Sequence, residues 1–139
     1  MKITLKNTKK AFTLLELIVV VVIIGILAGI MVPSYTRARE RAIDKQAKSI
    51  LSLLRSAERN YKMETGVYYP AGTSTTSLSD INSNLNLDLV DDGNWDYTVA
   101  AWNSGATFIA ALYRNKGGYI RTWTITSNTV NATCSGTCP

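Results

Sequence analysis

Few side chains in this 139-residue sequence are placed where they could do chemistry, and the most unusual of them is Glu16. It is the one charged residue between Phe12 and Val32, a run of 21 residues that is otherwise almost entirely apolar. An ionised carboxylate in a hydrocarbon environment costs about 2.5–3.5 kcal/mol unless a cation pairs with it. The run itself contains no cation, so Glu16 needs a partner from outside the run.

Two cysteines, Cys134 and Cys138, lie four positions apart near the carboxyl end. We interpret them as a disulfide, which indicates an oxidising compartment outside the cytoplasm. The alternatives are free thiols or a metal site, although two thiolates without histidine supply only half of a tetrahedral zinc site. Because the closed loop is short, the disulfide is expected to pin the tail and to add only modestly to global stability.

The chain contains no histidine, the commonest general base and the commonest metal ligand. It also has no nucleophile motif and no carboxylate pair on a clear scaffold, so we expect neither an enzyme nor a cofactor. The run of Asp88, Asp91 and Asp92 lacks the spacing of an EF-hand, and we interpret these acids as solvated rather than as calcium ligands. Five aromatic residues could form a platform for sugars or bases, but we favour a role in the core: Trp95, Tyr97, Phe108, Tyr119 and Trp123.

The element that must position Glu16 is a helix. At 1.5 Å per residue, the apolar run makes a helix about 31 Å long, which matches the ~30 Å core of a bilayer and predicts a membrane span. Gly25 and Gly29 either allow close helix approach or reflect the frequency of glycine in membrane helices. Pro33 lacks an N–H and is expected to kink the helix or weaken its hydrogen bonding. The alternatives are a secretory signal cut near Ala28 and a plain single-pass anchor.

The start of the chain resembles the amino terminus of type IV prepilins and type II secretion pseudopilins. Basic residues, a small residue and the sequence Phe-Thr-Leu-Leu-Glu-Leu precede a β-branched run, as they do in that family. The resemblance covers roughly residues 6–60. It implies that residues 1–11 are a leader peptide, that a prepilin peptidase cuts between Ala11 and Phe12, and that Phe12 is then N-methylated. Ala11 stands where the family usually has glycine.

The same resemblance implies a partner for Glu16. In the family, the glutamate at the fifth position of the mature chain pairs with the amino terminus of a neighbouring subunit. The resemblance also implies that Gly25 and Pro33 loosen the helix, which loses helicity there within a filament. It places the carboxyl-terminal head outside the cytoplasm, anchored in the bacterial inner membrane by a single pass. The charges that flank the span do not by themselves favour either orientation.

The net charge of +5 depends largely on the leader. Without the four lysines of residues 1–11, 11 basic side chains face 10 acidic ones, which gives no argument for a nucleic-acid partner. A basic cluster follows the apolar run: Arg37, Arg39, Arg41, Lys45 and Lys48. This cluster could contact DNA electrostatically, but we favour lipid headgroups or acidic patches on neighbouring subunits.

Beyond Ser34 the helical pattern becomes amphipathic, so one helix is predicted over residues 12–64, with 12–33 in the membrane or filament core and 34–64 on the head. Apolar residues recur at helical spacing: Ile43, Ala47, Ile50, Leu51, Leu54, Ala57 and Tyr61. Glu58 and Lys62 have the spacing of an i, i+4 ion pair, and Gly66 is a natural stop. Residues 65–93 are predicted to be a connecting loop with a short helical turn over Ser79–Leu85.

Residues 94–139 are predicted to form an antiparallel sheet and a disulfide-pinned tail. Alternating patterns over 95–101, 108–113 and 119–125 are separated by turn sequences, and a short fourth strand is predicted near Thr129–Thr133. One apolar face of this meander should cover the helix stripe. The predicted fold class is therefore α+β and type IV pilin-like, with a long, half-transmembrane amino-terminal helix packed against a small carboxyl-terminal antiparallel sheet.

The predicted function is that of a structural subunit of a type IV pilus-like filament, assembled through its amino-terminal helix. The implied partners are other copies, related minor pilins, prepilin peptidase, an inner-membrane assembly platform and membrane lipid. The alternative within the family is a pseudopilin of the type II secretion system, in a periplasmic pseudopilus rather than an extracellular pilus. We see no calcium-ligand cluster of the kind that major pseudopilins carry, and the terminal cysteine pair is more typical of pilins. A monomeric membrane-anchored binding module is a remote alternative.

Overall fold

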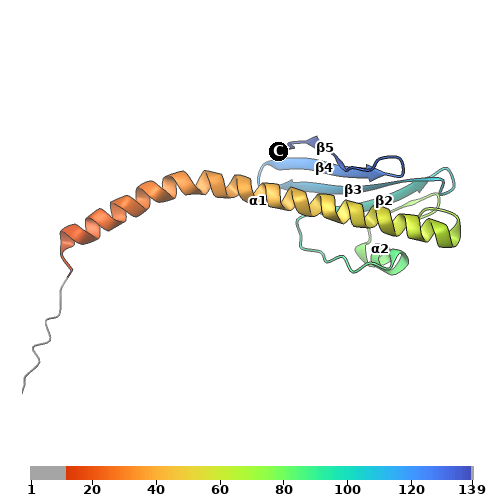
Figure 1. The fold of residues 1–139 in the computed structure, drawn as a ribbon, viewed down its shortest axis with the longest axis horizontal. Coiled ribbons are helices and arrows are strands. Elements are labelled where there is room, and N and C mark those ends of the chain that lie inside the picture. Colours follow the sequence, from red (N-terminus) through yellow and green to blue (C-terminus); the bar gives the residue numbers. More distant parts are fainter. Residues whose placement is uncertain (1–11, 139) are drawn as a thin grey trace, which may run out of the picture. The chain divides into compact units, whose positions relative to one another are not determined.

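The computed structural model describes residues 12–138, so the predicted leader and Ala11 lie outside the described residues. The chain divides into two compact units, Met1–Arg39 and Glu40–Pro139, which are described separately. The elements follow in chain order (Figure 1): α1 (Leu14–Thr65), β1 (Ser74–Thr75), α2 (Leu78–Leu85), β2 (Asp96–Trp102), β3 (Thr107–Lys116), β4 (Tyr119–Thr126) and β5 (Thr133–Gly136).

The predicted long helix is confirmed as α1, which has 52 residues and runs through Gly25, Gly29 and Pro33 as one helical segment. It ends at Thr65, just before Gly66, whose φ of +87° is a conformation that glycine adopts without a steric cost. The Gly66 N–H donates to the carbonyl of Lys62 at 2.8 Å, which satisfies one of the last carbonyls of the helix.

The strands form a five-stranded antiparallel meander in the order β1-β2-β3-β4-β5. The three predicted alternating segments are confirmed as β2, β3 and β4, and their register places Val99 opposite Ala110 and Leu112 opposite Trp123. In the turn between β2 and β3, Gly105 has a φ of +82°, and a Cβ there would lie 2.7 Å from Cβ of Val67.

The last strand is not where the sequence pattern placed it. Thr126 N–H donates to the Thr129 hydroxyl at 2.9 Å, and Thr129 N–H donates to the Thr126 hydroxyl at 3.2 Å. These two bonds close a turn, so pairing with β4 resumes only at β5, where Thr133 lies opposite Thr124. The two-residue β1 was not predicted.

The core of the second unit lies between one face of the sheet and the amphipathic half of α1 (Figure 1). The predicted helix stripe is confirmed, since Ala47, Leu51 and Leu54 are fully buried. Four of the five aromatic residues noted above are buried in this core, and Tyr119 is half-buried. The aromatic residues therefore hold the sheet on the helix and do not form an exposed platform.

The connecting segment contributes its own short helix to this core. The predicted turn is confirmed as α2, which buries Ile81 and Leu85. Its start is capped by Ser77, whose hydroxyl accepts the Asp80 N–H at 3.2 Å, and its end by Asn86, at a φ of +51°.

Candidate functional site

The residues predicted to act in assembly lie at the start of α1, where Glu16 closes a capping box with Thr13. The Thr13 N–H and the Thr13 hydroxyl both donate to Oε2 of Glu16 at 3.1 Å. In return, the Glu16 N–H donates to the Thr13 hydroxyl at 3.2 Å. This reciprocal pattern satisfies amide groups that a helix start otherwise leaves unpaired, and it places a carboxylate at the positive end of the helix dipole.

Sequence reasoning missed the role of Thr13, although Thr-x-x-Glu before an apolar run is a known signal for a helix start. The capping box uses one carboxylate oxygen of Glu16. The other oxygen, Oε1, accepts no hydrogen bond from any residue within 12–138. The carboxylate is therefore oriented by its own helix and keeps one oxygen for a second donor.

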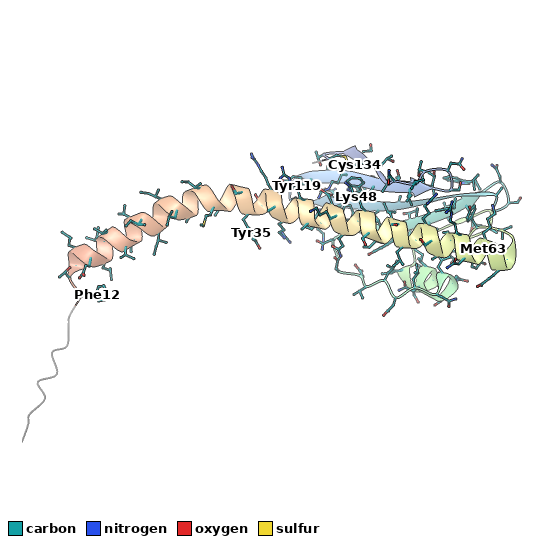
Figure 2. All side chains as sticks on the ribbon, in the orientation of Figure 1. Phe12, Tyr35, Lys48, Met63, Tyr119 and Cys134 are labelled. Atoms are coloured by element: carbon teal, nitrogen blue, oxygen red, sulfur yellow. A yellow bond between two sulfur atoms is a disulfide. The ribbon has the colours of Figure 1, made fainter. Side chains whose placement is uncertain are left out.

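The apolar half of α1 is exposed along its length (Figure 2). Phe12 is 80% exposed, and a Cβ added at Gly25 or Gly29 would meet nothing within 4 Å. Within the described residues, α1 is the helix whose length and composition suit a membrane span. An apolar surface of this size needs a covering of lipid or of other helices.

A buried ionic cluster, which we call the Glu40–Arg121 cluster, joins α1 to the sheet in the second unit. Arg121 donates from Nη2 to Glu40 at 2.7 Å and from Nε to Asp44 at 2.6 Å. Arg114 Nη2 lies 2.9 Å from the second Glu40 oxygen, and Trp123 Nε1 donates to Asp44 at 3.0 Å. Burial raises the pKa of Glu40, but the hydrogen bond and charge of Arg121 and the charge of Arg114 outweigh it, so the net pKa is lowered.

The sequence contains a signal for this cluster. The signal is easily missed, because the residues that carry it are charged. Arg121 alternates in phase with Trp123 and Ile125, and all three are buried on the core face of β4. Glu40 and Asp44 are in phase with the apolar helix stripe. Charged residues are rarely buried without a partner, so their positions in phase with the apolar residues indicate that each needs a partner, although not which one.

Glu58 is a second buried acid, and its predicted ion pair with Lys62 is not formed. The Glu58 side chain is 0% exposed, and its Oε2 accepts the backbone N–H of Tyr69 at 2.9 Å. Oε1 has no hydrogen-bond partner among the described residues. Lys62 instead donates to the Ala106 carbonyl at 3.3 Å and lies over the ring of Tyr68. Burial raises the pKa of Glu58 to about 7, despite the hydrogen bond from Tyr69.

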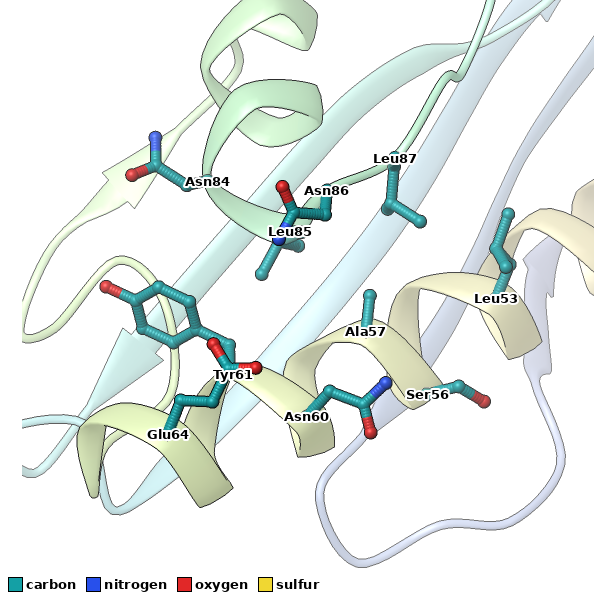
Figure 3. Close-up of a pocket in the computed structure, with 10 residues that line it drawn as sticks. All are labelled: Leu53, Ser56, Ala57, Asn60, Tyr61, Glu64, Asn84, Leu85, Asn86 and Leu87. Carbon is teal, nitrogen blue, oxygen red and sulfur yellow. The ribbon is translucent and has the colours of Figure 1, made fainter.

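A pocket of about 300 Å³ lies between α1 and α2. Figure 3 shows Tyr61 and Glu64 of α1 on one side and Leu85, Asn86 and Leu87 on the other. The remaining lining residues are Leu53, Ser56, Ala57, Asn60 and Asn84. We shall call this the α1–α2 pocket. No local sequence pattern indicates this pocket, because its two walls come from separate segments of the chain.

The other predicted site residues lie near the tail and in the acidic loop. Cys134 and Cys138 form a disulfide that spans a Cα–Cα distance of 6.1 Å. Asp91 accepts the Gly93 N–H at 2.8 Å, and Asp92 accepts from Gln46 at 2.8 Å. Within residues 12–138, no group of three or more His, Cys, Asp or Glu side chains could hold a metal ion.

Comparison with known proteins gives matches to this sequence. Residues 6–32 match the family profile described as the prokaryotic N-terminal methylation motif. The chain is 30% identical over 121 residues to the type IV wide pilus major component PilA4 of Thermus thermophilus, covering 86% of this chain and 92% of that protein. It is 31% identical over 126 residues to a fimbrial protein of Pseudomonas aeruginosa, covering 90% of this chain and 82% of that protein.

A third relative comes from a secretion system. The type II secretion system core protein G of Aeromonas hydrophila is 40% identical over 63 residues, covering 45% of this chain and 44% of that protein. No solved structure matches the chain. An α+β fold with a long amino-terminal helix, a methylation motif and matches over most of two pilus proteins define a class of filament subunits. The chain belongs to the family of type IV pilins and type II secretion pseudopilins.

Proposed function

We propose that this protein is a structural subunit of a type IV pilus-like filament. Prepilin peptidase cuts between Ala11 and Phe12 and methylates the new amino group, and the mature chain assembles through the first half of α1. The observation that carries this proposal is an exposed apolar helix that begins at a methylation motif, in a chain that aligns over 92% of a wide pilus major component.

In this proposal Glu16 pairs with the methylated amino group of Phe12 in a neighbouring copy. The capping box supports this role, because Thr13 holds the carboxylate at the helix start and leaves Oε1 unoccupied among residues 12–138. A secondary ammonium keeps its charge and two N–H donors, so it supplies the cation that the apolar run lacks. Gly25 and Pro33 are the positions where we propose that α1 loosens inside the filament.

The proposed location is the bacterial inner membrane, with one pass and the head outside the cytoplasm, followed by transfer into an extracellular pilus. The proposed partners are other copies, related minor pilins, prepilin peptidase, an assembly platform in the inner membrane and lipid. The role is structural and not enzymatic, which is consistent with the lack of histidine. The disulfide near the carboxyl end fits an oxidising compartment.

The test is mass spectrometry of the mature amino terminus combined with filament yield in a sheared surface fraction. Wild-type protein should begin at N-methylated Phe12 and be recovered in the sheared fraction. Glu16→Gln keeps an acceptor for the capping box but removes the charge, so it should be cut and inserted normally yet yield few filaments. Thr13→Ala is the matched control, because it removes the two hydrogen bonds of the Thr13 hydroxyl, at about 1 kcal/mol, and keeps the charge of Glu16.

Two outcomes would contradict the proposal. A normal filament yield from Glu16→Gln would refute the role of the Glu16 charge. An intact Met1, or a cut near Ala28, would leave a simple anchored or secreted module.

The second candidate is a pseudopilin of the type II secretion system, favoured by the 40% identity to a core protein G over 45% of this chain. The two candidates differ in where the mature protein goes. A pseudopilin should be absent from the sheared surface fraction at normal expression, and its deletion should stop export of secreted enzymes. A pilin should be recovered from that fraction, and its deletion should leave export unchanged.

A further inference from the structure

The α1–α2 pocket has the chemistry of a receptor for a long cationic side chain. Its lining combines apolar side chains, among them Ala57, Leu85 and Leu87, with polar ones, among them Asn60, Glu64 and Asn86. Among the described residues that line the pocket, Glu64 alone carries a charge. The apolar side chains suit an aliphatic stem, and the carboxylate with two amides suits a positively charged end.

Three polar side chains that line the pocket have no bonding partner among the described residues. The side chains of Asn60, Glu64 and Asn86 form no hydrogen bond or ion pair with any residue in 12–138. This contrasts with Asn84, whose amide already donates to the Tyr69 hydroxyl and the Asp80 carbonyl. The pocket therefore presents one carboxylate and two amide groups whose hydrogen-bonding capacity is free.

The matching cation lies elsewhere on α1. Arg41 and Lys45 are exposed and four positions apart, so they share one stripe of the helix. The ion pairs among residues 12–138 all use Arg114 or Arg121, so Arg41 has no carboxylate partner within that part of the chain. Of the two, Arg41 suits the pocket better, because a guanidinium offers five donors to one carboxylate and two amides.

Arg41 cannot reach the pocket of its own chain. Glu64 follows Arg41 by 23 positions on one continuous helix, which is about 35 Å along the axis and about 140° around it. The α1–α2 pocket and Arg41 therefore lie at different positions along the axis of α1 and on different sides of the molecule. A contact between two different surfaces, repeated from copy to copy, produces an open helical polymer when the rotation does not close a ring.

We propose that the α1–α2 pocket receives Arg41 of a second copy of this chain, with the guanidinium on Glu64. The proposal rests on the proposed function, because it names one contact between filament subunits. It also sets a geometry: two parallel copies joined in this way are displaced by about 35 Å along the helix axis.

A charge exchange in the full-length protein tests the contact. Glu64→Arg alone and Arg41→Glu alone should each reduce the sheared filament yield by about tenfold, since each places like charges together. The double variant, Arg41→Glu with Glu64→Arg, should restore most of the yield. The matched control combines Arg41→Glu with Asp96→Arg, which makes the same change in charge outside this pocket and should not restore it.

A second measurement covers the case in which a charge variant fails to fold. A chain carrying both Arg41→Cys and Glu64→Cys should give a ladder of covalent multimers when filaments are treated with a flexible bis-maleimide. A chain carrying Arg41→Cys with Asp96→Cys should not. Absence of the ladder from intact filaments would overturn this contact, and so would failure of the double charge variant to recover when that variant is folded.

The outcomes also separate this proposal from the proposed function. If the wild-type protein is never methylated and forms no filaments, the proposed function fails. If wild-type filaments form and either the ladder is absent or the exchange fails in folded protein, this contact alone is wrong. If Arg41→Glu lowers the amount of protein in the membrane while Glu64→Arg changes neither that amount nor the filament yield, Arg41 contacts lipid headgroups. The contact with the pocket is then also overturned.

Discussion

Raising the pH from 4.5 to 7.5 is expected to destabilise the head of this protein, because Glu58 must ionise inside the core. The side chain is fully buried, its Oε1 has no hydrogen-bond partner among the described residues, and its Oε2 accepts only the Tyr69 N–H. Burial of this kind disfavours the charged form of a carboxyl group. The pKa of Glu58 accordingly rises from an ordinary 4.5 to about 7.

The sign and size of the effect follow from proton linkage. Between pH 4.5 and 7 the folded protein keeps the Glu58 proton and the unfolded chain has lost it, so the free energy of unfolding falls as the pH rises through this window. A pKa difference of about 2.5 corresponds to a total loss of about 3 kcal/mol, complete above pH 7. Glu40 and Asp92 have lowered pKa values, so their stabilising contributions are lost only as the pH falls toward and below about 4.

The assay is urea unfolding of the full chain in a non-ionic detergent, followed by tryptophan fluorescence, since Trp95 and Trp123 are buried in the head. Glu58→Gln keeps an acceptor for the Tyr69 N–H and cannot ionise, so its stability should vary little from pH 4.5 to 7.5. At pH 7.5 it should exceed that of the wild type by about 3 kcal/mol.

The control is Glu64→Gln, which removes an exposed carboxylate from the same helix and should leave the pH dependence of the wild type intact. The decisive comparison is the difference in unfolding free energy between wild type and Glu58→Gln as a function of pH. If that difference is constant from pH 4.5 to 7.5, Glu58 does not titrate in the core and the reasoning is refuted.

Two further predictions concern the ion pairs between α1 and the sheet and the disulfide in the tail. Arg121→Met should lower the unfolding free energy by about 3–5 kcal/mol, because it leaves Asp44 and one Glu40 oxygen buried without their cation; a loss below 1 kcal/mol in urea unfolding would contradict this. Replacing both Cys134 and Cys138 by serine should cost at most about 2 kcal/mol, because the closed loop is short. Hydrogen exchange should then be faster in β5 than in β3, and equal acceleration in both strands would show that the disulfide stabilises the whole sheet.

Local patterns were enough to predict most of the fold. The apolar run, the helical stripe from Ile43 to Tyr61 and the stop at Gly66 predicted α1 to within two residues at each end. Alternating residues between turn sequences predicted β2, β3 and β4. These signals are reliable because burial on one face imposes a period of 3.6 on a helix and of 2 on a strand, and both can be seen in a short window.

Local patterns failed where the partner of a residue is distant in sequence. Glu58 was predicted to pair with Lys62, its neighbour on the next turn, yet it turns inward to Tyr69 while Lys62 bonds to Ala106. The fourth strand was placed too early because the turn closed by Thr126 and Thr129 uses side-chain hydroxyls, which leave no periodic pattern.

By itself, the sequence predicted an apolar amino-terminal helix and, through the resemblance of residues 6–60, the family that the match over 92% of a wide pilus major component then showed. Those features are local, so they can be recognised without knowing how the rest of the chain folds. Only the tertiary structure decided where the buried charges go, because Arg121 meets Glu40 and Asp44 across 81 and 77 positions. The α1–α2 pocket likewise exists only once α2 has packed on α1, since a cavity is a property of two surfaces brought together.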